Sequence, residues 1–287
     1  MKKNINLHWI TFIPYFINQI NKMFKSLFNW LKKEKKIDNY NGIFNDIPRQ
    51  YFQGDMFNVG FWDKETVNQL EACFELIEKT IENIENIPKK IADIGCGLGG
   101  PTNFMSKKLN EATVTGINFY PSQVKYCQNT YPNCDFKVMD ATKLNIKSNE
   151  LDLIVSFEAA FHFNSRLKFL KECYRTLKVG GSLRICDDML TKDIASNYLY
   201  NSPLNEINYL ENIGEYEKML SRIGFKNIEI TDVTESTIVP WAINFSKWLK
   251  EQYLEKLIEE NHYHQWIEII ELTKKNTISY VLVKAKK

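Results

Sequence analysis

The chain has 287 residues and a net charge of only +2, from 37 basic and 35 acidic side chains. This length suits one elaborated α/β domain, and the near-neutral charge gives no footprint of nucleic-acid binding. Six cysteines are scattered without a C-x-x-C pair, and no apolar run is long enough to span a bilayer. We therefore expect a cytoplasmic protein with reduced thiols and no nucleic-acid partner.

Residues 1–50 are expected to form an N-terminal helical extension. Bulky side chains recur at helical spacing over residues 12–31, with lysines nearby. The pattern predicts a helix that packs on the main domain or covers its pocket. A membrane-surface helix is the alternative, which we favour less because the strongly segregated polar face of interfacial helices is missing. No small-residue cleavage site marks a signal peptide.

Residues 51–287 are expected to form the main domain, with a helix over 64–87 and a core over 88–190. Apolar strands alternate with helices in this core, which predicts a doubly wound, mostly parallel sheet of the α/β class. Such sheets bind ligands outside the carboxyl ends of their strands. The expected strands lie at residues 90–94, 112–117, 134–139, from 151, and at 182–186, and the helices at 102–109 and 166–177.

A glycine-rich turn follows the first of these strands. Glycine tolerates positive φ and lets the backbone pass close to a ligand, so Gly95, Gly97 and Gly99 indicate such an approach. The next helix offers free N–H groups and a positive dipole end. The turn also satisfies the dinucleotide fingerprint G-x-G-x-x-G. However, a carboxylate at Asp93 would repel a pyrophosphate and attract a cationic ligand instead.

The spelling Asp-x-Gly-x-Gly-x-Gly from Asp93 to Gly99 resembles motif I of the class I S-adenosylmethionine-dependent methyltransferases. Residues 59–284 resemble their small-molecule subgroup, which includes sugar O-methyltransferases of natural products. The resemblance implies S-adenosyl-L-methionine as cofactor, held by Asp93, Gly95, Gly97 and Gly99. It also implies a Rossmann-like sheet of seven strands, with an antiparallel last strand over 277–284 and a helical cap inserted at 235–276.

Asn118 ends the second strand, close to where a ribose-binding carboxylate is expected in such folds. Its amide offers one acceptor and an NH₂ donor, so it can satisfy only half of the pattern that two ribose hydroxyls require. Gln123 lies at the start of the next helix. By the resemblance it reaches the cofactor, and the alternative is ordinary helix surface.

Asp140 ends the third strand, where a carboxylate is well placed to accept a hydrogen bond from the adenine amino group. The pair Asp140 and Ala141 matches the adenine-contacting motif of the family, and we assign Phe157, on the fourth strand, to the same cofactor site. The alternative for Asp140 is that it caps the following turn.

His162 follows the fourth strand and Asp187 follows the fifth. A neutral imidazole can remove the proton of a hydroxyl acceptor, and an aspartate on the neighbouring strand can orient it. The related sugar O-methyltransferases carry a histidine and an aspartate at these positions. Two alternatives stay open: His162 is a hydrogen-bonded core residue, or the acceptor is an amine and His162 only shapes the pocket.

The aromatic residues of the cap, such as Trp241 and Trp266, either contact the acceptor or fill the core. His262 and His264 flank a tyrosine, but no further ligand at matching spacing completes a metal site, so we predict none. We thus expect a methyltransferase that acts on a small-molecule acceptor, by O-methylation. The alternatives are an N-methyltransferase, a non-catalytic cofactor-binding protein and, less favoured, a nicotinamide-dependent dehydrogenase.

Overall fold

The computed structural model divides the chain into two compact units, Met1–Gly42 and Ile43–Lys287. The structure describes residues 46–85, 87–192 and 208–287, all within the second unit. The helix predicted over 12–31 lies outside the described residues. None of the described helices is both long and apolar enough to cross a bilayer.

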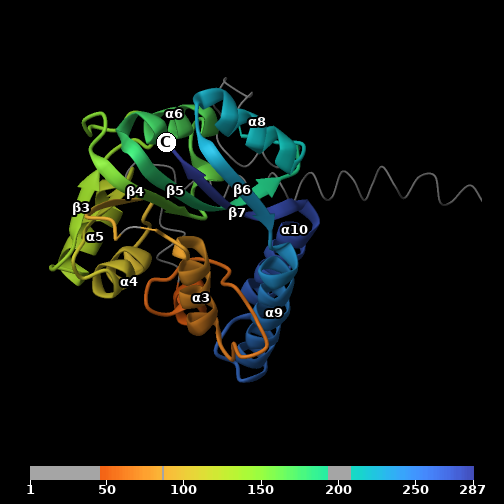
Figure 1. Ribbon diagram of the computed structural model, residues 1–287. Coiled ribbons are helices and arrows are strands. Elements are labelled where there is room, and N and C mark those ends of the chain that lie inside the picture. The colour runs from red at the N-terminus through yellow and green to blue at the C-terminus, as the bar shows by residue number, and fades with distance from the viewer. Residues whose placement is uncertain (1–45, 86, 193–207) are drawn as a thin grey trace, which may run out of the picture. The chain divides into compact units, whose positions relative to one another are not determined.

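The described residues form one sheet of seven strands, drawn in Figure 1. The strand order β3-β2-β1-β4-β5-β7-β6 places β4 at the centre, and the order of the parallel strands reverses between β1 and β4. The five strands β1 to β5 pair in parallel, whereas β7 pairs antiparallel with β5 and β6. This confirms the predicted doubly wound sheet. The strands are β1 (Lys90–Ile94), β2 (Thr113–Asn118), β3 (Asp135–Val138), β4 (Leu151–Phe157), β5 (Leu177–Leu190), β6 (Lys226–Asp232) and β7 (Thr277–Lys286).

The helices lie mainly on the two faces of the sheet (Figure 1). On one face α3 and α9 pack against side chains such as Leu153 and Val155, and on the other α6 and α8 pack against Ile154 and Ile185. The helices are α2 (Asp46–Phe52), α3 (Gln69–Ile81), α4 (Gly100–Lys108), α5 (Pro121–Thr130), α6 (Arg166–Thr176), α8 (Ile213–Ile223), α9 (Ile238–Leu254) and α10 (Glu260–Asn276), and two 3₁₀ helices are η3 (Ala160–His162) and η4 (Thr234–Ser236).

Several helix ends differ from the sequence expectation; the helix predicted over 64–87, for example, ends at Ile81. The helix predicted over 64–87 begins only at Gln69, because Asn68 caps it by accepting a hydrogen bond from the backbone of Glu71. The helix α6 ends at Thr176, and β5 starts directly at Leu177. Gly180 lies within β5 and has a φ of +80°.

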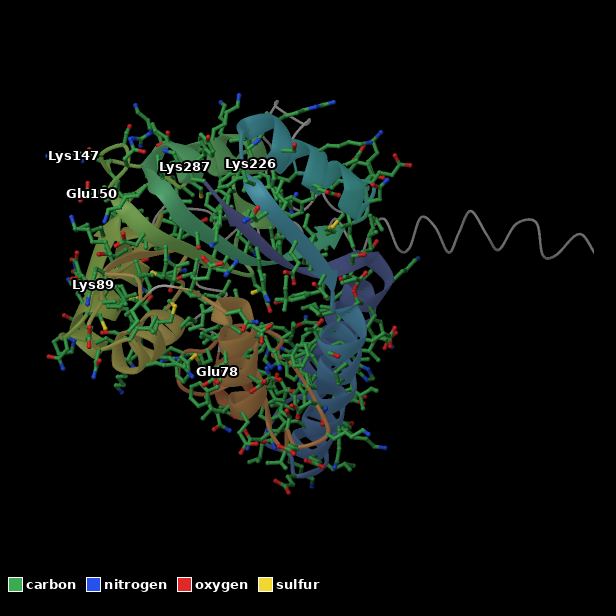
Figure 2. The ribbon with its side chains drawn as sticks, viewed as in Figure 1. Glu78, Lys89, Lys147, Glu150, Lys226 and Lys287 are labelled. Carbon is green, nitrogen blue, oxygen red and sulfur yellow. The ribbon has the colours of Figure 1, made fainter. Side chains whose placement is uncertain are left out.

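Charged side chains of both signs lie on the outside of the domain. Lys89, Glu150, Lys226 and Lys287 are among those labelled in Figure 2. Several form exposed ion pairs, such as the one between Lys89 Nζ and Glu111 Oε2 at 2.8 Å. Exposed pairs of this kind contribute little to stability.

Candidate functional site

The glycine turn lies at the carboxyl end of β1, next to the point where the strand order reverses. Gly95, Gly97 and Gly99 all have positive φ, at +84°, +54° and +87°. A Cβ on Gly95 would lie only 2.4 Å from the Cβ of Ala159. The turn therefore needs glycine both for its conformation and for close packing, and its backbone N–H groups lead into the start of α4.

Asp93 lies beneath this turn and is fully buried. Its Oδ2 accepts a 2.6 Å hydrogen bond from the Thr102 hydroxyl, but its Oδ1 has no partner among the described residues. Burial raises the pKa of this carboxyl to about 7. A buried carboxylate oxygen without a donor, below a backbone turn open to close approach, fits a ligand that carries positive charge or N–H donors.

Asn118 and Gln123 are brought together beside the turn. The Asn118 amide nitrogen donates to the Gly97 carbonyl at 3.0 Å and to the Gln123 side-chain oxygen at 2.6 Å. Both side chains are buried. The amide group of Asn118 thus holds the turn through Gly97 and α5 through Gln123, while its Oδ1 accepts from the backbone N–H of Phe119 at 2.7 Å. The ribose contact of Asn118 stays a prediction.

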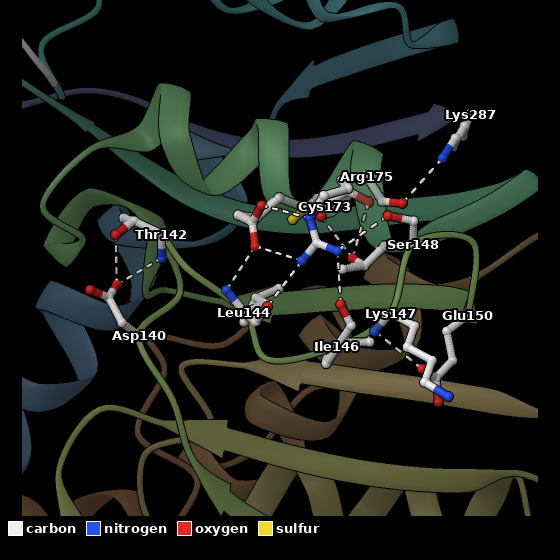
Figure 3. A network of polar contacts seen from close by, with 12 residues as sticks. Asp140, Thr142, Leu144, Ile146, Lys147, Ser148, Glu150, Cys173, Arg175 and Lys287 are labelled. Carbon is white, nitrogen blue, oxygen red and sulfur yellow. Dashed lines mark hydrogen bonds and ion pairs between the residues drawn. The ribbon is translucent and has the colours of Figure 1, made fainter.

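Asp140 follows β3 and makes the turn-capping contacts named as its alternative role. Its Oδ1 accepts from the backbone N–H and the hydroxyl of Thr142, at 2.8 and 2.7 Å. The segment beyond it is fastened to α6, where Arg175 donates to the carbonyls of Leu144 and Ile146 (Figure 3). Ala141 and Phe157 are both buried at the ends of β3 and β4. The contact that we predict between these residues and the adenine of the cofactor stays a prediction.

His162 ends the short helix η3, at the carboxyl end of β4. Its ring contacts that of Phe161, with the ring centroids 4.0 Å apart. Burial lowers the pKa of the imidazole to about 4, so His162 is neutral at pH 7. A neutral imidazole can accept a hydrogen bond, although it holds an added proton only weakly.

Asp187 does not orient His162, which corrects the sequence expectation. Its Oδ2 instead accepts from Arg166 Nε at 2.8 Å and from the Tyr216 hydroxyl at 3.0 Å, and its Oδ1 has no partner among the described residues. Strand neighbours are close, but successive side chains point to opposite faces. Asp187 points to the face covered by α6 and α8, where Arg166 balances its charge.

Arg166 and Asn208 connect Asp187 to the loop that carries His162. Arg166 donates through its guanidinium to the Asn208 carbonyl and through its backbone N–H to the Asn208 side chain. The Asn208 amide donates in turn to the carbonyls of Phe161 and Phe163, on either side of His162. The sequence analysis did not identify Arg166 or Asn208 as site residues. Nothing in the local sequence distinguishes a buried arginine at the start of a helix from an exposed one.

Glu158, the residue after β4, was also missed. Its Oε1 accepts two hydrogen bonds of 2.7 Å, from the backbone N–H of Val59 and from the Tyr280 hydroxyl. The donors come from a loop before α3 and from β7, far apart in the chain. A glutamate immediately after an apolar strand was the available signal.

The aromatic residues of the cap pack into the core on the α3 side. Tyr51 stacks on Phe245 with the ring centroids 4.2 Å apart, and Trp241 and Trp248 flank Phe245. The Tyr51 hydroxyl and Trp241 Nε1 are buried without partners among the described residues. On α10, His264 lies near the exposed Glu260, and the described residues hold no cluster of three metal-ligating side chains.

Comparison with known proteins decides the family. A family model described as a methyltransferase domain matches residues 92–185, which include the glycine turn and the end of β4. The chain is 27% identical over 216 residues to the methyltransferase GfsG of Streptomyces halstedii, covering 71% of this chain and 77% of the relative. The chain is a class I S-adenosylmethionine-dependent methyltransferase. Its cofactor is S-adenosyl-L-methionine.

This methyltransferase is also similar to one further relative and to one solved structure. It is 25% identical over 242 residues to the erythromycin 3''-O-methyltransferase of Saccharopolyspora erythraea, covering 78% of this chain and 79% of the relative. Its fold matches that of a phosphoethanolamine N-methyltransferase from Haemonchus contortus in complex with S-adenosyl-L-methionine. There the TM-score is 0.67 and the identity 17%, covering 90% of this chain and 59% of the other. The second likeness concerns the fold alone.

Proposed function

We propose that this methyltransferase transfers a methyl group to a hydroxyl of a small molecule. The observation that carries the cofactor part is the unpartnered Oδ1 of the buried Asp93 beneath the glycine turn. S-adenosylmethionine, when bound, supplies a methyl carbon activated by a sulfonium. Asp93 and the turn from Gly95 to Gly99 would hold its charged end, and Asn118, Gln123, Asp140, Ala141 and Phe157 would line the nucleoside side.

A hydroxyl acceptor is supported by the erythromycin relative, whose name gives an O-methylation. It is also supported by His162, which lies at the carboxyl end of β4 and is neutral at pH 7. His162 is our candidate general base: its imidazole would accept the hydrogen of the hydroxyl and hold the oxygen in line for attack. Positioning of this kind supplies much of the rate enhancement in displacement reactions.

The first test is cofactor binding. Titration calorimetry with S-adenosylmethionine and with NAD⁺ should show binding of the first and none of the second, and Asp93→Asn should weaken the first by at least about tenfold. Binding of NAD⁺ alone would reject the proposal.

The second test is the acceptor. The chain is incubated with labelled S-adenosylmethionine and three probes: a methyl glycoside, an alkylphenol and N,N-dimethylglycine. The label is expected on one of the two hydroxyl compounds, and His162→Ala should lower turnover while cofactor affinity stays nearly unchanged. Transfer to the amine alone would reject hydroxyl methylation.

A further inference from the structure

Glu158 directly follows β4, at the same end of the sheet as the glycine turn, and has an unusual backbone conformation. Its φ is +48°, in the left-handed region that residues other than glycine rarely adopt. Its backbone N–H donates to the Cys186 carbonyl of β5 at 3.0 Å, which fixes the strand end. Left-handed residues of this kind cluster at functional sites, where the surrounding structure holds them in place.

The carboxylate of Glu158 is held at one oxygen only. Val59 and Tyr280 both donate to Oε1, and Oε2 accepts no hydrogen bond from the described residues. The backbone N–H of Val59 and the hydroxyl of Tyr280, from separate elements, fix the orientation of the Glu158 carboxylate. Its Oε2 is therefore oriented and can accept a hydrogen bond from another donor.

The titratable side chains of the described residues that interact electrostatically with Glu158 are all acids. The titratable groups that act on it or respond to it are Cys73 on α3, Cys186, Asp187 and Asp188 on β5, and Tyr280 on β7. Asp188 is buried, and its Oδ1 has no partner in the described part of the chain. Burial raises the pKa of Glu158 to about 7, while hydrogen bonds from Tyr280 and Val59 counteract the rise.

Glu158 and His162 differ in how firmly they hold a proton. Burial raises the pKa of Glu158 and lowers that of His162, so Glu158 holds a proton more tightly than His162 does. At neutral pH, a proton taken from an acceptor is thus retained by Glu158 far better than by His162. General-base catalysis is most efficient when the pKa lies near the working pH.

We infer that Glu158 is a second catalytic residue of this methyltransferase, which contacts the acceptor hydroxyl through Oε2 and takes its proton. The inference rests on the proposed function. In the step, the acceptor O–H bond breaks and the proton passes to Oε2. The acceptor oxygen bonds to the methyl carbon as the carbon–sulfur bond breaks, and the electron pair of that bond stays on sulfur. Glu158 thus takes over the role of base first proposed for His162, which keeps a hydrogen bond to the hydroxyl and orients it. Tyr280 is a positioning residue that acts through Glu158.

The main experiment compares the wild type with Glu158→Gln, which keeps the shape and an acceptor oxygen for Val59 and Tyr280. Glu229→Gln, on the outer strand β6, is the matched control. With the hydroxyl probe that is methylated, kcat/KM is measured from pH 5 to pH 9 as S-adenosylhomocysteine released. Glu158→Gln should lower kcat/KM by about 10² to 10⁴ and abolish the limb near pH 7, with cofactor affinity unchanged.

A loss below about threefold, or an unchanged limb near pH 7, would overturn the inference. Failure of the proposed function is seen separately, as methylation of the amine probe alone or as absent cofactor binding in the wild type.

A second measurement needs no acceptor. The protein is labelled with ¹³C at its glutamate carboxyl carbons, and the signal missing in Glu158→Gln is followed by NMR as pH changes. We expect its midpoint near pH 7. Tyr280→Phe removes a donor to the carboxylate and should move the midpoint to higher pH. A midpoint near the ordinary glutamate value, or no response to Tyr280→Phe, would contradict the inference.

Discussion

Arg166 and Asp187 form a fully buried ion pair in which Arg166 Nε lies 2.8 Å from Asp187 Oδ2. The pair joins the start of α6 to β5, and the Tyr216 hydroxyl brings in α8. Through Asn208 it also reaches the loop of His162. Asp187 therefore supports this loop through Arg166 and does not contact the imidazole itself.

Removing one partner of this pair should destabilise the fold strongly. In Asp187→Ala, Arg166 keeps a buried charge without a counterion, and breaking such a pair costs about 3–5 kcal/mol. The double variant Arg166→Met with Asp187→Leu should recover most of that loss, because it leaves no charge uncompensated. Urea unfolding measures both. A loss below about 1 kcal/mol in Asp187→Ala would contradict the structure.

Asp93 should make the free protein less stable as pH rises. Its pKa is about 7 in the folded chain and about 4 when unfolded, so the folded state binds the extra proton between these values. Stability relative to Asp93→Asn is then lost by at most roughly 1.4 kcal/mol per pH unit over this window, and stays constant above it. Thermal unfolding without ligand should show Asp93→Asn gaining on the wild type from pH 4 to pH 7. Asp135→Asn, at the exposed first residue of β3, is the matched control.

Two glycines with similar φ should respond differently to alanine. At Gly95 the new Cβ meets Ala159 at 2.4 Å, whereas at Gly180, with a φ of +80°, nothing lies within 4 Å. Both variants carry the strain of a left-handed alanine, about 1–2 kcal/mol. Only Gly95→Ala should displace the turn and weaken S-adenosylmethionine binding, by at least about tenfold. Calorimetric titration of both variants checks this, and equal affinities would be inconsistent with it.

Asn118→Asp should weaken cofactor binding, although the ribose pattern alone predicts tighter binding. The substitution replaces the NH₂ group, which donates both hydrogen bonds, with a carboxylate oxygen that faces the Gly97 carbonyl and the Gln123 oxygen. The turn is then repelled from the residue that holds it, and we expect a loss of about tenfold in affinity. Asn227→Asp on the exposed start of β6 serves as the control. Tighter binding in Asn118→Asp would restore the direct ribose role.

The features that could be predicted from the sequence are those that depend on short stretches of neighbouring residues. The glycine turn, Asp93 beneath it and the alternation of strands and helices follow from short-range conformational preference and hydrophobic period. The partners of Asp187 could not be predicted in this way, because strand order brings residues near but side-chain alternation decides which face they share. Glu158 depends on Val59 and Tyr280, which lie 99 positions before it and 122 after it. Such contacts exist only once the chain has folded.

The antiparallel direction of β7 also has a practical use. Lys287, the residue after β7, lies against the first part of β5, where its backbone groups exchange hydrogen bonds of 2.9 Å with Gly180 and Gly181. This is the end of the sheet where the parallel strands begin, whereas the glycine turn and Glu158 lie at the other end, where β1 and β4 finish. A purification handle or fluorescent reporter appended after Lys287 would emerge on the far side, so the chain can be immobilised there for ligand screening without obstructing access.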